Sequence, residues 1–130
     1  RCTVMVSVKS NMVQGVLRVV QSGTYDNGQS PLSVWKEICT AALEHKARAI
    51  LAINFIEAVI QLKDVERLVE LCSRNPALLA IANVRMVLPH RDDIEVFTVV
   101  KYKGEQEGIP MRTFYDEGTA RDWINEILRG

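Results

Sequence analysis

The sequence has few of the residue patterns that mark catalytic or metal-binding proteins. It contains three cysteines and two histidines, and no C-x-x-C, H-x-x-x-H or H-E-x-x-H pattern. Zinc sites need three or four such ligands, often at short spacings, so we expect no metal and no cofactor. Basic and acidic residues number 16 each, giving zero formal net charge. Because nucleic-acid and anionic-membrane surfaces need a clustered positive excess, we expect no nucleic-acid partner.

Long apolar runs and disulfide patterns are also missing. No stretch reaches the roughly 18 apolar residues of a membrane span, and no signal peptide is visible. Cys39 and Cys72 fall on apolar helix faces, and with Cys2 they make an odd number. This pattern predicts free, buried thiols. A cytoplasmic protein that does not span a membrane is therefore the expectation.

The chain has the size of one domain. Its 130 residues contain no repeat, low-complexity segment or linker, so we expect a single domain over residues 1–130. The hydrophobic share of 48% is that of an average soluble protein. A chain of this length buries enough surface to be stable without disulfides or metals.

Strand signals dominate the first part of the chain. Alternating apolar residues predict a strand over residues 3–10, a hairpin connection over 11–15 and a second, antiparallel strand over 16–22. A nearly continuous apolar run over residues 49–55 predicts a strand covered on both faces, at the centre of a parallel sheet.

Helix signals separate these strands. Ser30 and Pro31 suit the N-cap and first position of a helix that runs to about residue 46. Apolar spacing predicts a second helix from Lys63, ended at Asn75-Pro76. Asp116 suits the cap of a final helix with apolar positions at Ala120, Trp123, Ile124, Ile127 and Leu128.

The intervening segment is less regular. Residues 77–82 suit either a short helical turn or the start of a strand, and residues 84–88 predict a strand. We assign residues 94–102 to a helix because a parallel return needs a crossover, and residues 111–115 to the last strand. The order ββαβαβαβα predicts an α/β fold: a mixed, mostly parallel sheet of about five strands with helices packed on it.

Several residues that could carry chemistry have a simpler interpretation. The glycine-bearing turn from Gly23 resembles a phosphate-binding loop, but Gln29 replaces its lysine and Asp26 adds a negative charge. His45 suits a structural position at a helix C-terminus. The carboxylate pairs at 92–93 and 116–117 suit helix N-termini.

The turn after the central strand is the expected functional site. Open α/β sheets usually bind ligands or partners at the carboxyl ends of their strands. The polar residues expected there come from this turn and from the end of the following strand: Asn54, Glu57, Gln61, Lys63, His90 and Arg91. Apolar residues of the turn form either an exposed binding patch or an inward-packing group: Ile56, Ala58, Val59 and Ile60.

Five local strings along the chain carry a family resemblance: Gly23-Thr24-Tyr25-Asp26, Trp35-Lys36-Glu37-Ile38, Ala49-Ile50-Leu51-Ala52-Ile53-Asn54, Val87-Leu88-Pro89 and Arg112-Thr113-Phe114-Tyr115-Asp116-Glu117. With the order of elements, they resemble the STAS-like family of sulfate transporter and anti-sigma-factor antagonist domains, especially its SpoIIAA-like branch. The resemblance covers nearly the whole chain. It implies a small cytoplasmic regulatory domain that binds proteins or small ligands and catalyses no reaction.

The resemblance also implies an alternative function, the carriage of a small apolar ligand. Classical antagonists carry a phosphorylated serine after the central strand, but residues 54–64 contain no Ser, Thr or Tyr. Some SpoIIAA-like members look like lipid-carrying CRAL-TRIO domains, which implies a small apolar ligand in a cavity beneath the second and third helices. We therefore expect a non-enzymatic protein-interaction module, with a carrier of an apolar ligand as the alternative and an enzyme as a third reading. The sequence does not decide between a monomer and a homodimer.

Overall fold

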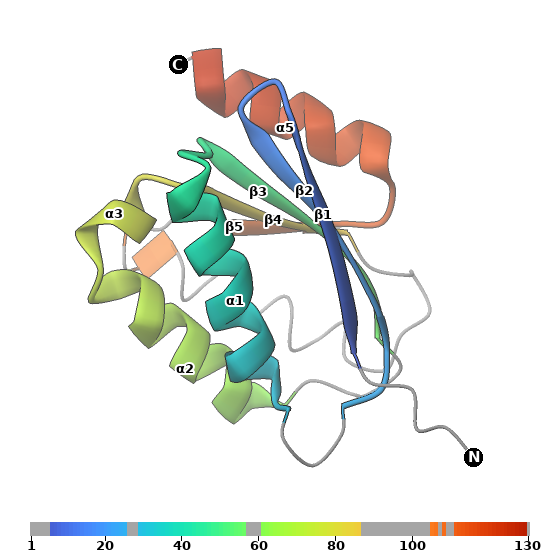
Figure 1. Ribbon diagram of the computed structural model, residues 1–130. Coiled ribbons are helices and arrows are strands. Elements are labelled where there is room, and N and C mark those ends of the chain that lie inside the picture. Colours follow the sequence, from blue (N-terminus) through green and yellow to red (C-terminus); the bar gives the residue numbers. More distant parts are fainter. Residues whose placement is uncertain are drawn as a thin grey trace.

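A five-stranded sheet forms the middle layer of this computed structural model, which describes residues 6–25, 29–56, 61–86, 105–106, 108 and 111–129 (Figure 1). The strands lie side by side in sequence order: β1 (Ser7–Val13), β2 (Val16–Gly23), β3 (Ala49–Ile56), β4 (Ala82–Met86) and β5 (Met111–Phe114). β1 is antiparallel to β2, and the later neighbours are parallel. The predicted α/β class and mixed sheet are confirmed.

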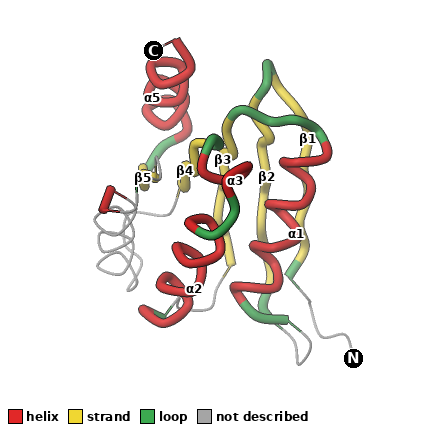
Figure 2. The backbone as a smooth tube through the Cα atoms, turned by 90° about the vertical axis from the view of Figure 1, so that its left-hand side faces the viewer, coloured by secondary structure: helices red, strands yellow, loops and turns green. Residues whose placement is uncertain are grey.

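Helices cover both faces of the sheet. α1 (Pro31–Glu44), α2 (Leu62–Ser73) and the short α3 (Pro76–Leu79) pack on one face, and α5 (Glu117–Arg129) packs on the other. Figures 1 and 2 show α1, α2 and α3 together, with α5 apart from them. Among the described helices, none combines the length and the apolarity needed to cross a membrane.

The position of β3 between two helical layers explains why its sequence is almost wholly apolar. Ile50 and Ala52 pack toward α1 and α2, whereas Leu51 and Ile53 pack toward α5. Because successive side chains of a strand point to opposite faces, a strand between two helical layers needs apolar residues at both sets of positions. The prediction of a central, doubly covered strand is confirmed.

The first hairpin differs from the prediction. β1 continues to Val13, and the connection shrinks to Gln14 and Gly15, with φ of 50° and 82°. Two consecutive positive φ angles are typical of tight hairpin turns whose twist matches that of the strands. Residues 11–13 therefore pair with β2 and do not form a loop, and residues 3–5 of the predicted strand lie outside the described residues.

Two of the predicted helix starts are confirmed. The Ser33 N–H donates to Ser30 Oγ at 3.1 Å, the Ser30 N–H donates to Ser33 Oγ at 2.8 Å, and Pro31 follows the cap. At α5, the Thr119 N–H donates to Asp116 Oδ1 at 2.8 Å. Hydrogen bonds from Thr119 lower the pKa of Asp116, as is typical of a carboxylate that caps a helix.

The predicted element order is not reproduced. A short helix, α3, precedes β4, because Asn75 Oδ1 accepts a hydrogen bond from the Ala77 N–H and Pro76 fills the first helical position. β4 starts at Ala82, two residues before the predicted strand start at 84. The helix predicted over residues 94–102 lies outside the described residues.

An ion-pair network joins α5 to the sheet. Arg18 on β2 donates two hydrogen bonds to the Glu117 carboxylate, from Nε to Oε2 at 2.9 Å and from Nη2 to Oε1 at 3.1 Å. Arg121 Nε donates to Oε2 of the same carboxylate at 3.1 Å. The hydrogen bonds from Arg18 are the main reason that the pKa of Glu117 is lowered. Nearby, Trp123 contacts Phe114, and the Arg112 guanidinium lies 5.5 Å from the centre of the Trp123 ring.

Candidate functional site

The predicted site lies at the carboxyl ends of β2 and β3, where α2 begins. The two strands are parallel, and Gln21 of β2 is the register partner of Asn54 of β3. Strand alternation places both residues on the sheet face covered by α1 and α2, because Val19 and Ala52 belong to that core. Two amide side chains therefore lie next to each other at this edge.

Asn54 supports the turn from within. The sequence predicts it at the binding surface, but it is only 1% exposed. Its Oδ1 accepts a hydrogen bond from the Ile56 N–H at 2.9 Å. A side-chain amide that bonds the backbone two residues later mimics a turn, so Asn54 fixes the path of the chain as it leaves β3.

Gln21 is a feature that the sequence patterns do not reveal. It is 3% exposed, and its Nε2 has no hydrogen-bond partner in the structure. A buried amide donor without a partner destabilises a fold by roughly 1–3 kcal/mol, so such groups are rare. In the sequence, Gln21 follows an apolar run and resembles an ordinary polar residue at a strand end.

Gln61 and Lys63 are exposed at the start of α2. Gln61 is the N-cap residue, and its backbone N–H donates to Asp64 Oδ2 at 3.1 Å. These two predicted site residues therefore lie near each other on the surface. Glu57, His90 and Arg91 lie outside the described residues.

Large apolar side chains border the same turn. Phe55 and Leu62 are 43% and 46% exposed, which places them among the most exposed large apolar residues of the described chain. The sequence left open whether Ile56 is exposed or packs inward, and Ile56 is buried in the core under α1 and α2. Ala58, Val59 and Ile60 lie outside the described residues. The exposed apolar positions are thus one residue before Ile56 and at the first residue of α2.

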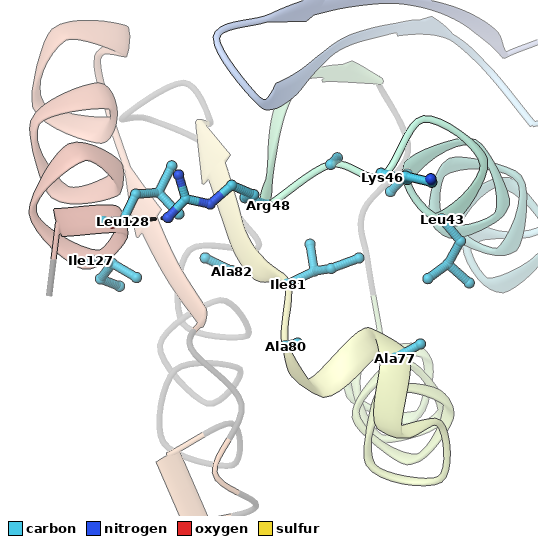
Figure 3. A pocket seen from close by; sticks show the side chains of 11 residues that line it. Leu43, Lys46, Arg48, Ala77, Ala80, Ile81, Ala82, Ile127 and Leu128 are labelled. Atoms are coloured by element: carbon cyan, nitrogen blue, oxygen red, sulfur yellow. Dashed lines mark hydrogen bonds between the residues drawn. The ribbon is translucent and has the colours of Figure 1, made fainter.

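A pocket opens at the opposite edge of the sheet, near the amino ends of β3 and β4 (Figure 3). Its volume is about 530 Å³. The walls come from the C-terminal parts of α1 and α5 and from the α3–β4 connection. Nine apolar side chains line it: Ala42, Leu43, Ala47, Ala77, Ala80, Ile81, Ala82, Ile127 and Leu128.

Two cations complete the lining of this pocket, Lys46 and Arg48. Lys46 follows the C-cap residue of α1 and has a φ of 53°, so it turns the chain from the helix toward β3. Arg48 Nη2 donates to the Leu128 carbonyl at 2.9 Å, near the end of α5. Figure 3 shows the Arg48 side chain extending toward Leu128. Of the described residues that line the pocket, none is acidic.

A shallower groove runs between α1 and α2. Its volume is about 490 Å³, and it is lined by Leu32, Lys36, Arg67, Glu70, Leu71, Arg74 and Asn75. Glu70 and Arg74 form an exposed ion pair at 3.6 Å. The cavity predicted beneath the second and third helices stays a prediction, because the third predicted helix lies outside the described residues.

The cysteines with described positions do not form a reactive site. Cys39 on α1 and Cys72 on α2 are buried in the core and are not in a disulfide, as predicted. Thiolates react when they are partly exposed next to positive charge, which an apolar core does not provide. In the described part of the chain, His, Cys, Asp and Glu side chains form no group of three that could hold a metal ion.

The sequence was also compared with known proteins. Models of protein families give no match, and neither do the curated protein sequences.

Proposed function

We propose that this chain is a non-enzymatic protein-interaction module of STAS-like type, located in the cytoplasm. Its working surface is the carboxyl edge of the sheet around the turn between β3 and α2. The observation that carries the proposal is the exposure of Phe55 and Leu62 beside this turn. Gln61 and Lys63 add exposed polar groups next to them. An apolar centre with a polar rim is the usual composition of a protein-binding surface.

The backbone beneath this surface is held on both sides of Phe55. Asn54 accepts a hydrogen bond from the Ile56 N–H, and both Asn54 and Ile56 are buried. The backbone of Phe55 therefore has a defined position at the end of β3. Because a positioned backbone loses less conformational entropy on binding, this supports Phe55 as an anchor residue.

The chemistry of the turn favours binding over regulation by phosphorylation or catalysis. Residues 54–64 contain no hydroxyl group and no histidine or cysteine. The described groups here are amides, a lysine and the Asp64 carboxylate, which already accepts a hydrogen bond from Gln61. Such groups recognise a partner through hydrogen bonds and charge, and STAS-like domains of the antagonist type work by binding proteins.

An affinity pull-down with a double variant tests this proposal. Phe55→Ser combined with Leu62→Ser removes both exposed apolar groups, whereas Met12→Ser removes one exposed methionine on β1 as a matched control. The protein partner retained by the wild type is expected with the Met12 variant and lost with the double variant. Circular dichroism checks that the variants are folded. Equal recovery by all three proteins would refute the assignment of the surface.

Self-association is a distinguishable outcome of the same test. Sedimentation of the purified wild type and the double variant shows whether the turn binds a second copy of the chain. A wild-type dimer that is a monomer in the double variant would show that the partner at the proposed surface is a second copy of the chain. A monomer in both cases leaves a different protein as the partner.

The alternative function, carriage of a small apolar ligand, is favoured by a separate observation. The pocket at the amino edge is lined mostly by apolar side chains, and its volume is within the range of about 300–1,000 Å³ typical of small-molecule sites. It lies at the other end of β3 from the turn, so the two functions do not compete for the same surface.

A further inference from the structure

We infer that the pocket between the C-terminal parts of α1 and α5 binds a small anionic amphiphile, an aliphatic chain that ends in a carboxylate. The inference deepens the apolar-ligand alternative and is independent of the protein-binding surface at the opposite edge. Eight residues of β3 separate the two places, a distance of roughly 25 Å along an extended strand.

The apolar part of the ligand is indicated by the shape and lining of the pocket. Alanines supply five of the eleven lining residues: Ala42, Ala47, Ala77, Ala80 and Ala82. These small side chains leave a hollow where larger residues would meet, and Leu43, Ile81 and Ile127 provide the apolar walls. Because apolar surface contacts water unfavourably, an aliphatic chain is the group that gains most by filling this space.

The acidic part of the ligand is indicated by charge. Among the described lining residues, Lys46 and Arg48 supply two positive charges and none supplies a negative charge. The chain as a whole is neutral, so this excess is local. Within the described residues, neither cation takes part in a salt bridge, and a carboxylate would supply the missing partner.

Arg48 also stabilises the end of α5, but this leaves it capacity to bind an anion. Lys46 follows the end of α1, and Arg48 bonds the Leu128 carbonyl of α5. A guanidinium has five N–H donors, and the bond to Leu128 uses one of them. Arg48 can therefore hold α5 and bind an anion at the same time. Figure 3 shows Arg48 extending toward Leu128 and Lys46 extending toward the α1 side of the pocket.

An NMR titration with chemically defined probes tests the inference. The probes are octanoate, 1-octanol and octyltrimethylammonium, which share a chain and differ in the charge of the end group. Octanoate is expected to shift the backbone amides at residues 80–82 and 127–128. It should bind about tenfold more tightly than 1-octanol, the factor expected for one charge-assisted hydrogen bond, and the cationic probe should bind most weakly.

Variants distinguish the contribution of the two cations to binding from that of the apolar lining. Lys46→Asn combined with Arg48→Gln removes both charges, and asparagine suits the positive φ at position 46. In this variant octanoate and octanol are expected to bind equally. Lys36→Gln removes an exposed lysine outside the pocket and should leave octanoate binding unchanged. Ala77→Leu enlarges an exposed residue of the lining and should weaken both probes.

Several results would overturn the inference. Octanoate that binds no better than octanol to the wild type would refute the role of the cations. Shifts confined to other parts of the chain, or no saturable binding below the concentration at which octanoate forms micelles, would refute the pocket itself. None of these results bears on the Phe55 and Leu62 surface, which is tested by different variants.

Discussion

The neighbouring amides Gln21 and Asn54 should contribute to the free energy of unfolding with opposite signs, because only Asn54 makes a hydrogen bond that stabilises the fold. Both are almost fully buried and lie in register on adjacent strands. Gln21 Nε2 has no hydrogen-bond partner, whereas Asn54 Oδ1 accepts the Ile56 N–H at 2.9 Å. Replacing each amide by an apolar side chain of similar size should therefore change the free energy of unfolding in opposite directions.

The magnitudes follow from the cost of unpaired buried groups. Gln21→Met removes an unsatisfied donor and adds apolar surface to the core, so we expect the free energy of unfolding to rise by about 1 kcal/mol. Asn54→Leu removes the side-chain acceptor that the buried Ile56 N–H uses in the folded protein, so we expect a fall of about 2 kcal/mol. For a domain of this size, 1 kcal/mol corresponds to a shift in the melting temperature of about 4 °C.

Urea denaturation followed by circular dichroism measures both changes. Asn11→Leu, which replaces an exposed amide on β1, serves as the control and should change stability by less than about 0.5 kcal/mol. A loss of stability in Gln21→Met would refute the reasoning, because it would mean that the Gln21 amide makes a stabilising bond. An unchanged Asn54→Leu variant would show that the Ile56 N–H does not depend on Asn54.

Two further predictions concern ion pairing and thiols. The pKa of Glu117 is lowered in the folded protein, so its stabilisation is present above the unfolded pKa of about 4.3 and is lost as the pH falls through the folded pKa. Because Arg18 and Glu117 are 31% and 32% exposed, solvent screening limits the effect. Glu117→Gln should cost about 1 kcal/mol at pH 7, and this cost should shrink as the pH falls through the folded pKa, measured by urea denaturation. A pH-independent difference would contradict this assignment. Cys39 and Cys72 should resist thiol labelling until denaturant is added, since both are buried; rapid labelling of either under native conditions would contradict the placement of its helix.

The sequence predicted the parts of the fold that depend on local patterns. β3 was recognisable because a strand covered on both faces has no polar alternation. Ser30 and Asp116 were recognisable because short polar side chains before apolar periodicity mark helix starts. The ends of the first hairpin could not be recognised from the sequence. The positive φ of Gln14 is decided by how β1 and β2 pair and not by a strong turn residue at that position.

The sequence predicted where along the sheet the candidate residues lie, but not how deeply each of them is buried. The carboxyl end of β3 follows from the α/β pattern, but the depth of a residue below the surface does not. Asn54 looked like a surface amide, and its burial depends on the packing of α1 and α2 over this face. Phe55 looked like part of the buried run, and its exposure shows that the core on its face stops before position 55.

The pocket at the amino edge could not be predicted from the sequence. Its lining comes from three segments that are far apart in the chain, 42–48, 77–82 and 127–128. Each segment by itself has an ordinary composition. Only the packing of α1, α3 and α5 around the starts of β3 and β4 brings the alanines and the two cations together.

Calorimetric titration of the recovered partner tests the central claim, binding at the turn between β3 and α2, most directly. Full burial of Phe or Leu contributes about 1.5–3 kcal/mol, and roughly half of each side chain is exposed in the free protein, so each should contribute about 1 kcal/mol to binding. The Phe55→Ser, Leu62→Ser double variant should therefore bind about 30-fold more weakly than wild type, with Met12→Ser unchanged. Equal affinities for the wild type and the double variant would contradict the claim.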